Sequence, residues 1–213
     1  MRTMKRALLA LAMLLASCAS DGGSSGTGIT SVEGNVVAVQ RDGAMTSAAA
    51  SGLSTFAGIQ VIVEESHAAA ETDAAGRFVV RGKFDGRVTL RFERRVDGLG
   101  AHMTIVVPRG GTLTLHDVEI DVAADAAVAA DRHAVFDARV SGADCDAGTL
   151  SLLSIGDDTS GYRYEVDLAS AFVHDGDGTA VACGAVRAGE RVHVEARARP
   201  DDTFGNADVE VER

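Results

Sequence analysis

The chain has 213 residues and a formal net charge of −11, which argues against nucleic acid or anionic lipid as partners because both repel an acidic surface. Its length suits one large domain or two small ones. With no tryptophan and seven phenylalanines, any core must consist mainly of valine, leucine, isoleucine and alanine.

The first eighteen residues have the pattern of a bacterial lipoprotein signal. Basic residues precede an apolar run from Ala7 to Ala16, and Leu15-Ala16-Ser17-Cys18 fits the cleavage site at which the cysteine receives diacylglycerol. The alternatives are an ordinary secretory signal or a transmembrane helix, but a helix that spans a membrane needs ~20 apolar residues. We therefore predict that residues 1–17 are removed, that Cys18 is lipidated, and that the net charge becomes −14, since three basic residues and no acidic one are lost.

Residues 18–30 are predicted to form a flexible tether behind the lipid, because they are small and polar. Ala19 takes the place of the aspartate that marks inner-membrane retention, which favours the outer membrane in an organism with two membranes. The string Gly22-Gly23-Ser24-Ser25-Gly26 matches the Gly-x-Ser-x-Gly motif of serine hydrolases. That motif acts only on a turn between a strand and a helix, so we expect no nucleophile in this tether.

Residues 31–122 predict an antiparallel β-sandwich. Short β-branched or alternating runs are separated by glycine and aspartate turn signals, without a long helical pattern between them. The expected strands are Val36–Val39, Ile59–Val63, Phe78–Val80, Val88–Phe92, Thr104–Val107, Leu113–Leu115 and Val118–Ile120.

Residues 123–133 include an alanine-rich stretch without an amphipathic stripe, and we expect them to link two domains. Residues 134–213 again consist of short strand-like runs, which predict a small β-barrel-like domain or a second small sandwich. The expected strands are Ala134–Val140, Thr149–Ile155, Tyr162–Leu168, Ala171–Val173, Thr179–Cys183, Arg191–Ala198 and Ala207–Glu212. The fold class is therefore all-β.

Two cysteines remain after Cys18, namely Cys145 and Cys183. In an exported chain we expect them to form a disulfide, and the alternative is a pair of buried thiols.

The segment from Gly34 to Ile120 resembles the carboxypeptidase regulatory-like family, which has a transthyretin-like sandwich. The most specific shared element is Thr72-Asp73-Ala74-Ala75-Gly76-Arg77-Phe78, in which Asp73 is expected to bind local amides and Phe78 to enter the core. Gly34-Asn35-Val36-Val37 and Ala57-Gly58-Ile59 also match the family. The resemblance implies a structural or interaction module without catalytic residues of its own.

The segment from Phe136 to Val211 is similar, more weakly, to a bacterial envelope module catalogued as domain of unknown function 5666. The matching elements are Gly148–Leu152, Gly184–Val194 and Ala207–Val211. This resemblance implies a small β-barrel-like unit and assigns no function to it.

Candidate binding groups are few. Tyr162 and Tyr164 share one face of an expected strand and could stack on a sugar ring, although packing explains them as well. Asp175 and Asp177 could offer oxygen ligands to calcium, but a tight hairpin turn accounts for the same residues. The six histidines are scattered without metal-ligand spacing, so we expect no cofactor.

The sequence thus predicts a lipid-anchored envelope protein that is not an enzyme. One hypothesis is an interaction module that contacts another envelope protein, for example through an unpaired sandwich edge. The other is a module that binds polysaccharide or peptidoglycan. An exposed tyrosine pair beside a groove would favour the glycan, and a flat apolar patch would favour a protein partner.

Overall fold

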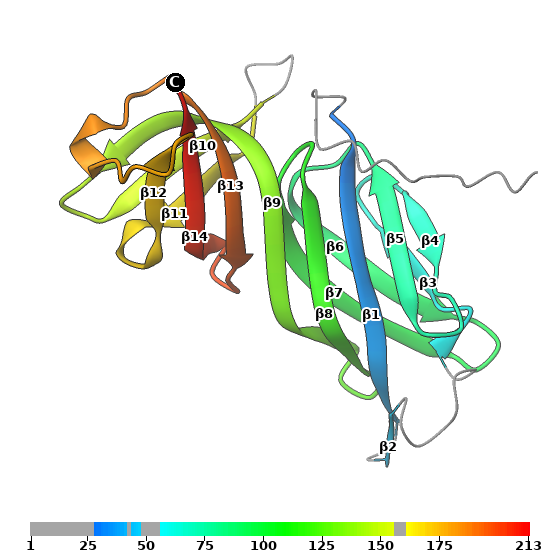
Figure 1. Ribbon diagram of the computed structural model, residues 1–213. Helices are drawn as coiled ribbons and strands as arrows, with labels where there is room; N and C mark the ends of the chain where they lie inside the picture. Colours follow the sequence, from blue (N-terminus) through cyan, green and yellow to red (C-terminus); the bar gives the residue numbers. More distant parts are fainter. Residues whose placement is uncertain (1–27, 42–43, 48–55, 156–160) are drawn as a thin grey trace, which may run out of the picture.

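The computed structural model describes residues 28–41, 44–47, 56–155 and 161–213, and within them the chain is all-β (Figure 1). The prediction of the fold class is confirmed. The strands are β1 (Thr30–Arg41), β2 (Ala44–Ser47), β3 (Gln60–Val63), β4 (Ala69–Glu71), β5 (Arg77–Gly82), β6 (Gly86–Arg94), β7 (Leu99–Val107), β8 (Thr112–Asp121), β9 (Ala126–Asp144), β10 (Thr149–Ser154), β11 (Arg163–Asp167), β12 (Phe172–Asp175), β13 (Arg191–Ala198) and β14 (Thr203–Glu212). Two short 3₁₀ turns, η2 (Leu168–Ser170) and η3 (Cys183–Ala185), accompany them.

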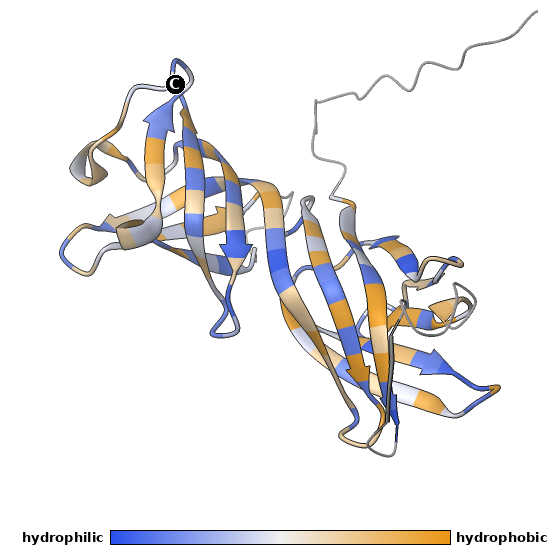
Figure 2. Ribbon diagram, turned by 60° about the horizontal axis from the view of Figure 1, so that its bottom comes forward, coloured by the Kyte–Doolittle hydropathy of each residue, from blue (hydrophilic) through white to orange (hydrophobic). Residues whose placement is uncertain are grey.

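The first lobe is a two-layered sandwich. One layer has the order β5–β1–β8–β9, and the other has the order β4–β3–β6–β7. Buried and exposed residues alternate along β5, β6 and β8, and Figure 2 shows the corresponding bands of hydrophobic and hydrophilic residues. The alternation follows from the strand period of two, which turns one set of side chains into the core and the other outward.

Pairing within the sandwich is not purely antiparallel, because β1 runs parallel to β8. The two runs expected at 113–115 and 118–120 belong to one strand, β8, which bulges at His116 and Asp117. Asp117 has a φ of 51°, which lets the extra residue leave the ladder without ending the strand.

Strand β9 connects the two lobes and belongs to both. Its first part, Ala126–Val135, pairs with β8 in the sandwich, whereas residues 133–144 pair with β13 and β10. In Figure 1 it runs as one curved ribbon from the sandwich into the second lobe. The segment expected as a linker, residues 123–133, therefore consists of a turn followed by the first part of a shared strand.

The second lobe is a small barrel that closes in the order β9–β10–β11–β14–β13–β9. Strand β11 runs parallel to β14, and β12 continues along β14 after η2. Five strands closed in this order, with the third parallel to the fifth, resemble the arrangement of an OB-fold barrel. The interior holds a cluster of aromatic rings, Phe136, Tyr164 and Phe204, with centroids 5.2–6.0 Å apart.

One strand expected in the barrel does not form. Residues 179–183 contribute only an isolated bridge at Ala180, and η3 begins at Cys183. The segment lies in the connection between β12 and β13, where no neighbouring strand continues to pair with it.

Several contacts between described residues hold the two lobes together. The backbone N–H of Arg109, in the β7–β8 turn of the sandwich, donates to the hydroxyl of Tyr164 at 3.1 Å. Arg87 forms an ion pair with Asp202 of the barrel. The ring of Tyr162 packs against Gly86, where an added Cβ would lie 2.4 Å from a ring carbon. These contacts, together with the core continuous through both lobes, make the described chain one packed unit.

Candidate functional site

The two tyrosines predicted as possible ligand-binding residues lie at the junction of the lobes. Tyr164 is 1% exposed, and its burial raises the pKa of its hydroxyl well above the usual value, so its ring is not available for stacking on a sugar. Tyr162 is partly buried, and its ring lies 5.2 Å from that of Tyr164. Both tyrosines pack in this structure, in agreement with the alternative interpretation from the sequence.

The aspartates considered for calcium form a hydrogen-bonded turn after β12. The backbone N–H of Thr179 donates to Asp175 Oδ1 at 3.0 Å and to Asp177 Oδ1 at 2.9 Å. Interaction with the Asp175 side chain, together with hydrogen bonds from Thr179, lowers the pKa of Asp177 to about 2. Among the described residues, no group of three or more His, Cys, Asp and Glu side chains is arranged to hold a metal ion. The turn accounts for both carboxylates.

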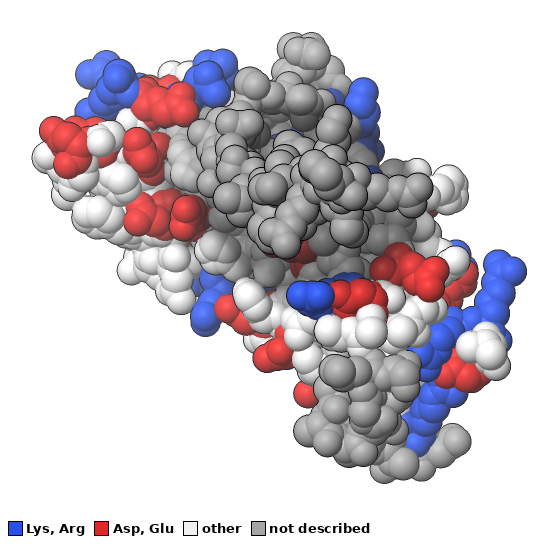
Figure 3. Space-filling view, turned by 45° about the vertical axis from the view of Figure 1, so that its right-hand side comes forward, with Lys and Arg blue, Asp and Glu red and all other residues white. Residues whose placement is uncertain are grey.

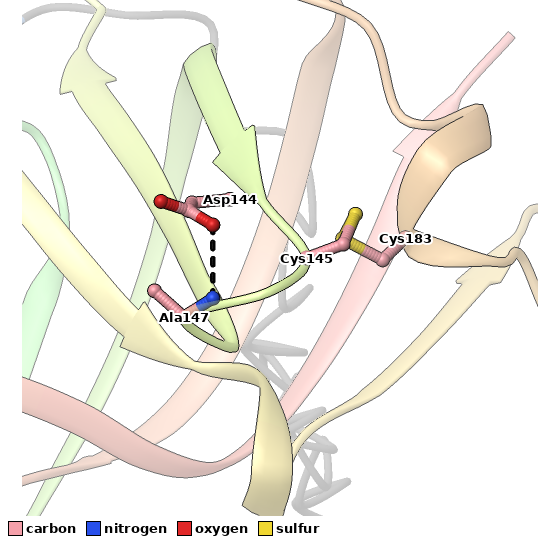
Figure 4. The surroundings of a disulfide bond; sticks show 4 residues. All are labelled: Asp144, Cys145, Ala147 and Cys183. Carbon is pink, nitrogen blue, oxygen red and sulfur yellow. Dashed lines mark hydrogen bonds between the residues drawn. A yellow bond between two sulfur atoms is a disulfide. The ribbon is translucent and has the colours of Figure 1, made fainter.

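The predicted disulfide between Cys145 and Cys183 is confirmed, with Cα atoms 5.8 Å apart (Figure 4). Cys145 lies in the β9–β10 turn, where Asp144 Oδ1 accepts a hydrogen bond from the N–H of Ala147 at 2.9 Å. Cys183 is the first residue of η3, so the bond fastens the long β12–β13 connection to the barrel. Cys18 and the Gly22–Gly26 string lie outside the described residues.

Two partly buried histidines contact carboxylates on neighbouring strands of the barrel. His174 Nε2 lies 2.6 Å from Asp208 Oδ1, and His193 Nδ1 lies 2.7 Å from Asp137 Oδ1. The carbonyl of Asp175 and the carboxylate of Asp208 raise the pKa of His174. These pairs join neighbouring strands on the surface of the barrel, and this structural role accounts for the histidines without a ligand.

The parts of an OB-fold barrel that commonly bind ligands have other contacts in this protein. The turn between its first two strands carries Cys145 and is joined to η3, and the turn between its last two strands carries Asp202, which pairs with Arg87 of the sandwich. The outward side chains of β10 and β11 among the described residues are Thr149, Ser151, Leu153, Arg163, Glu165 and Asp167, and none of them is aromatic. The barrel therefore offers no stacking surface on this face.

A depression lies on the outer face of the sandwich. It is a groove of about 460 Å³ that crosses β5, β1 and β8. The residues around it are Glu33, Gly34, Asn35, Ala75, Arg77, Phe78, Val79, Thr114, Leu115 and His116.

Glycine at position 34 is required beneath this groove. An added Cβ would lie 2.7 Å from the carbonyl oxygen of Leu115 and 2.9 Å from Cζ of Phe78. The ring of Phe78 therefore packs under β1 only because residue 34 has no side chain. The polar groups on the rim are held in place, since Thr114 Oγ1 donates to Glu33 Oε1 at 3.0 Å and Asn35 Nδ2 donates to Asp117 Oδ1 at 3.2 Å.

The turn before β5 has the structure that its sequence predicts. Asp73 Oδ1 accepts hydrogen bonds from the N–H groups of Ala75 and Arg77, at 2.8 and 2.9 Å. Gly76 has a φ of 78°, and Phe78 follows in the core with 3% exposure. The backbone N–H and side chain of Arg77 lower the pKa of Asp73.

Strand β5 forms the border of the groove and pairs only with β1 among the described residues. The backbone N–H and C=O of Arg77 bond to Asp73, on the side away from β1. Successive residues of an antiparallel strand direct their N–H and C=O groups to opposite sides of the strand, so alternate residues share one side. The N–H and C=O groups of Val79 and Arg81 therefore also point away from β1. We refer to Val79 and Arg81, together with Lys83 directly after the end of the strand, as the β5 edge.

The side chains of the β5 edge are open to solvent. Val79 is 44% exposed, and Arg81 and Lys83 are also exposed. Neither cation forms an ion pair or a side-chain hydrogen bond with the described residues, whereas Arg77 pairs with Asp73 at 2.8 Å. Figure 3, which brings this side of the molecule forward, shows basic side chains gathered at the sandwich end.

Sequence reasoning did not identify the groove or the β5 edge. The alternation of Arg77, Val79 and Arg81 with Phe78 and Val80 shows which side chains face outward. It does not show that β5 ends its sheet, because strand order depends on contacts between distant segments.

No family model matches the chain, and no curated protein was found to be similar to it. The described part of the chain contains no helix that is both long and apolar enough to cross a membrane.

Proposed function

We propose that this protein is a lipid-anchored, non-catalytic component of the bacterial cell envelope, with the outer membrane as its site, and that its sandwich binds another envelope protein. The observation that carries the binding role is the β5 edge beside the groove, where a strand with exposed side chains and outward backbone groups lacks a neighbour on one side. Strand edges of this kind accept an extended segment from a partner chain.

Three features support the proposed place in the envelope. The residues around Cys18 fit a lipoprotein cleavage site. The disulfide suits export to an oxidising compartment. The first described residues lie beside the β7–β8 turn, since Gly110 N–H donates to Thr30 Oγ1 at 3.1 Å, and this turn contacts the barrel through Arg109 and Tyr164. A tether would therefore start near the junction of the two lobes.

The carboxypeptidase regulatory-like resemblance belongs to the same proposal. The hydrogen-bonded turn at Asp73, the left-handed Gly76 and the buried Phe78 support it. The weaker resemblance of residues 134–213 to the second family is supported by a small closed barrel. In this proposal the chain is an interaction module whose barrel supports the sandwich.

A protein partner is preferred to a polysaccharide or peptidoglycan. The glycan hypothesis depended on an exposed tyrosine pair, and Tyr164 is buried. The half-exposed aromatic ring on the barrel is that of Phe172, and His174 stacks on it with centroids 5.2 Å apart. The groove and the β5 edge need no aromatic side chain to bind a peptide segment.

Crosslinking in intact cells tests the proposal. The full-length lipoprotein is crosslinked, captured by affinity and analysed by mass spectrometry, with an unrelated domain carrying the same signal and tether as the control. We expect an envelope protein that is recovered with this chain and not with the control. Recovery of glycan alone, or of nothing beyond the control, would contradict the proposal. Cys18→Ala is expected to abolish lipid labelling, and labelling that persists would contradict the anchor.

A further inference from the structure

We propose that the β5 edge binds an extended, acidic segment of the partner protein, which adds to the sandwich as a further strand. This inference rests on the proposed function and names the chemistry of its partner.

The backbone of the β5 edge can bind a strand without regard to its sequence. The N–H and C=O groups of Val79 and Arg81 point away from β1, because they have the same orientation as those of Arg77. Phe78 and Val80 face Gly34 and Val32 across the existing ladder. An added strand would therefore leave the β1–β5 pairing intact.

The charge of the β5 edge selects the partner. Arg81 and Lys83 form no ion pair among the described residues, although the whole chain carries a net charge of −11. Opposite charges on neighbouring strands stabilise their pairing, and like charges destabilise it. Acidic side chains at alternate positions of an added strand would share one face and meet these cations.

A second copy of this chain does not fit the same edge. Antiparallel pairing of two β5 strands about Val79 would place Arg77 of one copy opposite Arg81 of the other. The β5 edge is therefore suited to a different, acidic chain.

Peptide binding to the purified full-length lipoprotein in detergent tests this inference. The probe is a fluorescein-labelled synthetic peptide in which glutamate alternates with valine and threonine, and the comparison peptide has lysine in place of each glutamate. We expect saturable binding of the acidic peptide by fluorescence anisotropy and none of the lysine peptide. Equal binding of the two peptides, or no binding of either, would overturn the inference.

Charge reversal locates the site. The double variant Arg81→Glu/Lys83→Glu is expected to weaken binding of the acidic peptide at least about tenfold. Arg95→Glu is the matched control, since Arg95 is an exposed cation on the β6–β7 turn, and it should bind like the wild type. Equal effects of the double variant and the control would overturn the inference.

A backbone variant tests strand addition. Val79→Pro removes an N–H that points away from β1, so it should weaken peptide binding while preserving the circular dichroism spectrum. Unaltered binding by a folded Val79→Pro variant would contradict strand addition. If Val79→Pro does not fold, the comparison of Arg81→Glu/Lys83→Glu with Arg95→Glu tests the inference instead.

The same charge-reversal variant separates this inference from the proposed function. Capture of an envelope protein in cells that does not change with Arg81→Glu/Lys83→Glu would overturn the acidic-strand inference and support protein binding. Absence of any captured protein would contradict the proposed function itself.

Discussion

Loss of the disulfide is expected to destabilise the protein by about 4 kcal/mol. Cys145 and Cys183 are separated by 38 residues, and closing a loop of this length removes that much conformational entropy from the unfolded chain. The perturbation is Cys145→Ser/Cys183→Ser. For a domain of this size, about 4 kcal/mol corresponds to a fall of roughly 8–16 °C in Tm.

The bond also fixes the connection between β12 and β13, in which described backbone hydrogen bonds are mostly local. The N–H of Val186 donates to the carbonyl of Cys183 at 3.1 Å, and Arg213 reaches the carbonyl of Ala185 at 3.0 Å. Loss of the crosslink should therefore loosen this connection before the rest of the barrel unfolds.

Urea unfolding followed by circular dichroism measures the effect. Cys145→Ser alone should lose as much stability as the double variant, because either change opens the loop, and reduction of the wild type should reproduce the loss. A double variant within about 1 kcal/mol of the wild type would refute the loop-closure reasoning.

The remaining predictions concern the junction of the lobes. Gly86→Ala should cost roughly 2–4 kcal/mol, because the added Cβ would lie 2.4 Å from the Tyr162 ring at a φ of 73°. Gly148→Ala is the control, since Gly148 has a φ of 68° and open space around it, and it should cost about 1 kcal/mol. Equal decreases in Tm for the two variants would contradict the steric argument. Burial raises the pKa of Tyr164 above that of an unfolded tyrosine, so its contribution to stability is complete below about pH 10 and is lost as the pH rises further. Absorbance titration of the folded protein should show a tyrosine that ionises only above the usual range, and the absence of such a tyrosine would contradict the burial. Tyr164→Phe removes the hydroxyl that accepts a hydrogen bond from the N–H of Arg109, and the loss should cost about 1–2 kcal/mol in urea unfolding. An unchanged free energy of unfolding would contradict a stabilising role of this hydrogen bond. The barrel expressed without the sandwich should give the spectrum of an unfolded chain, because it loses these contacts, and a cooperative melting transition would contradict this.

Local patterns predicted most of the strands and the disulfide. Runs such as 88–92 and 191–198 alternate so regularly that their burial follows from the strand period alone. The cysteine pair was predictable because an exported chain with two remaining cysteines has one possible pairing.

The shared strand β9 could not be predicted in the same way. Its first part contains mainly alanine, and a small apolar residue gives no signal that separates buried from exposed positions. Ala127 and Ala129 are buried and Val128 is 59% exposed, so pairing with β8 decides the orientation. Such pairing depends on a distant segment.

The candidate site escaped prediction for a related reason. The sequence places Tyr162 and Tyr164 on one strand face, but the β7–β8 turn that covers Tyr164 comes from the other lobe. In contrast, Arg81 and Val79 are ordinary outward residues until the strand order leaves them at the end of a sheet.

Site-specific photo-crosslinking in living cells tests the central claim most directly. A photoreactive amino acid replaces Val79 at the β5 edge, and in a matched chain it replaces Val128, an exposed valine on β9. We predict a discrete adduct with another envelope protein from position 79 and not from position 128. The same adducts from both positions, or none from position 79, would contradict the account.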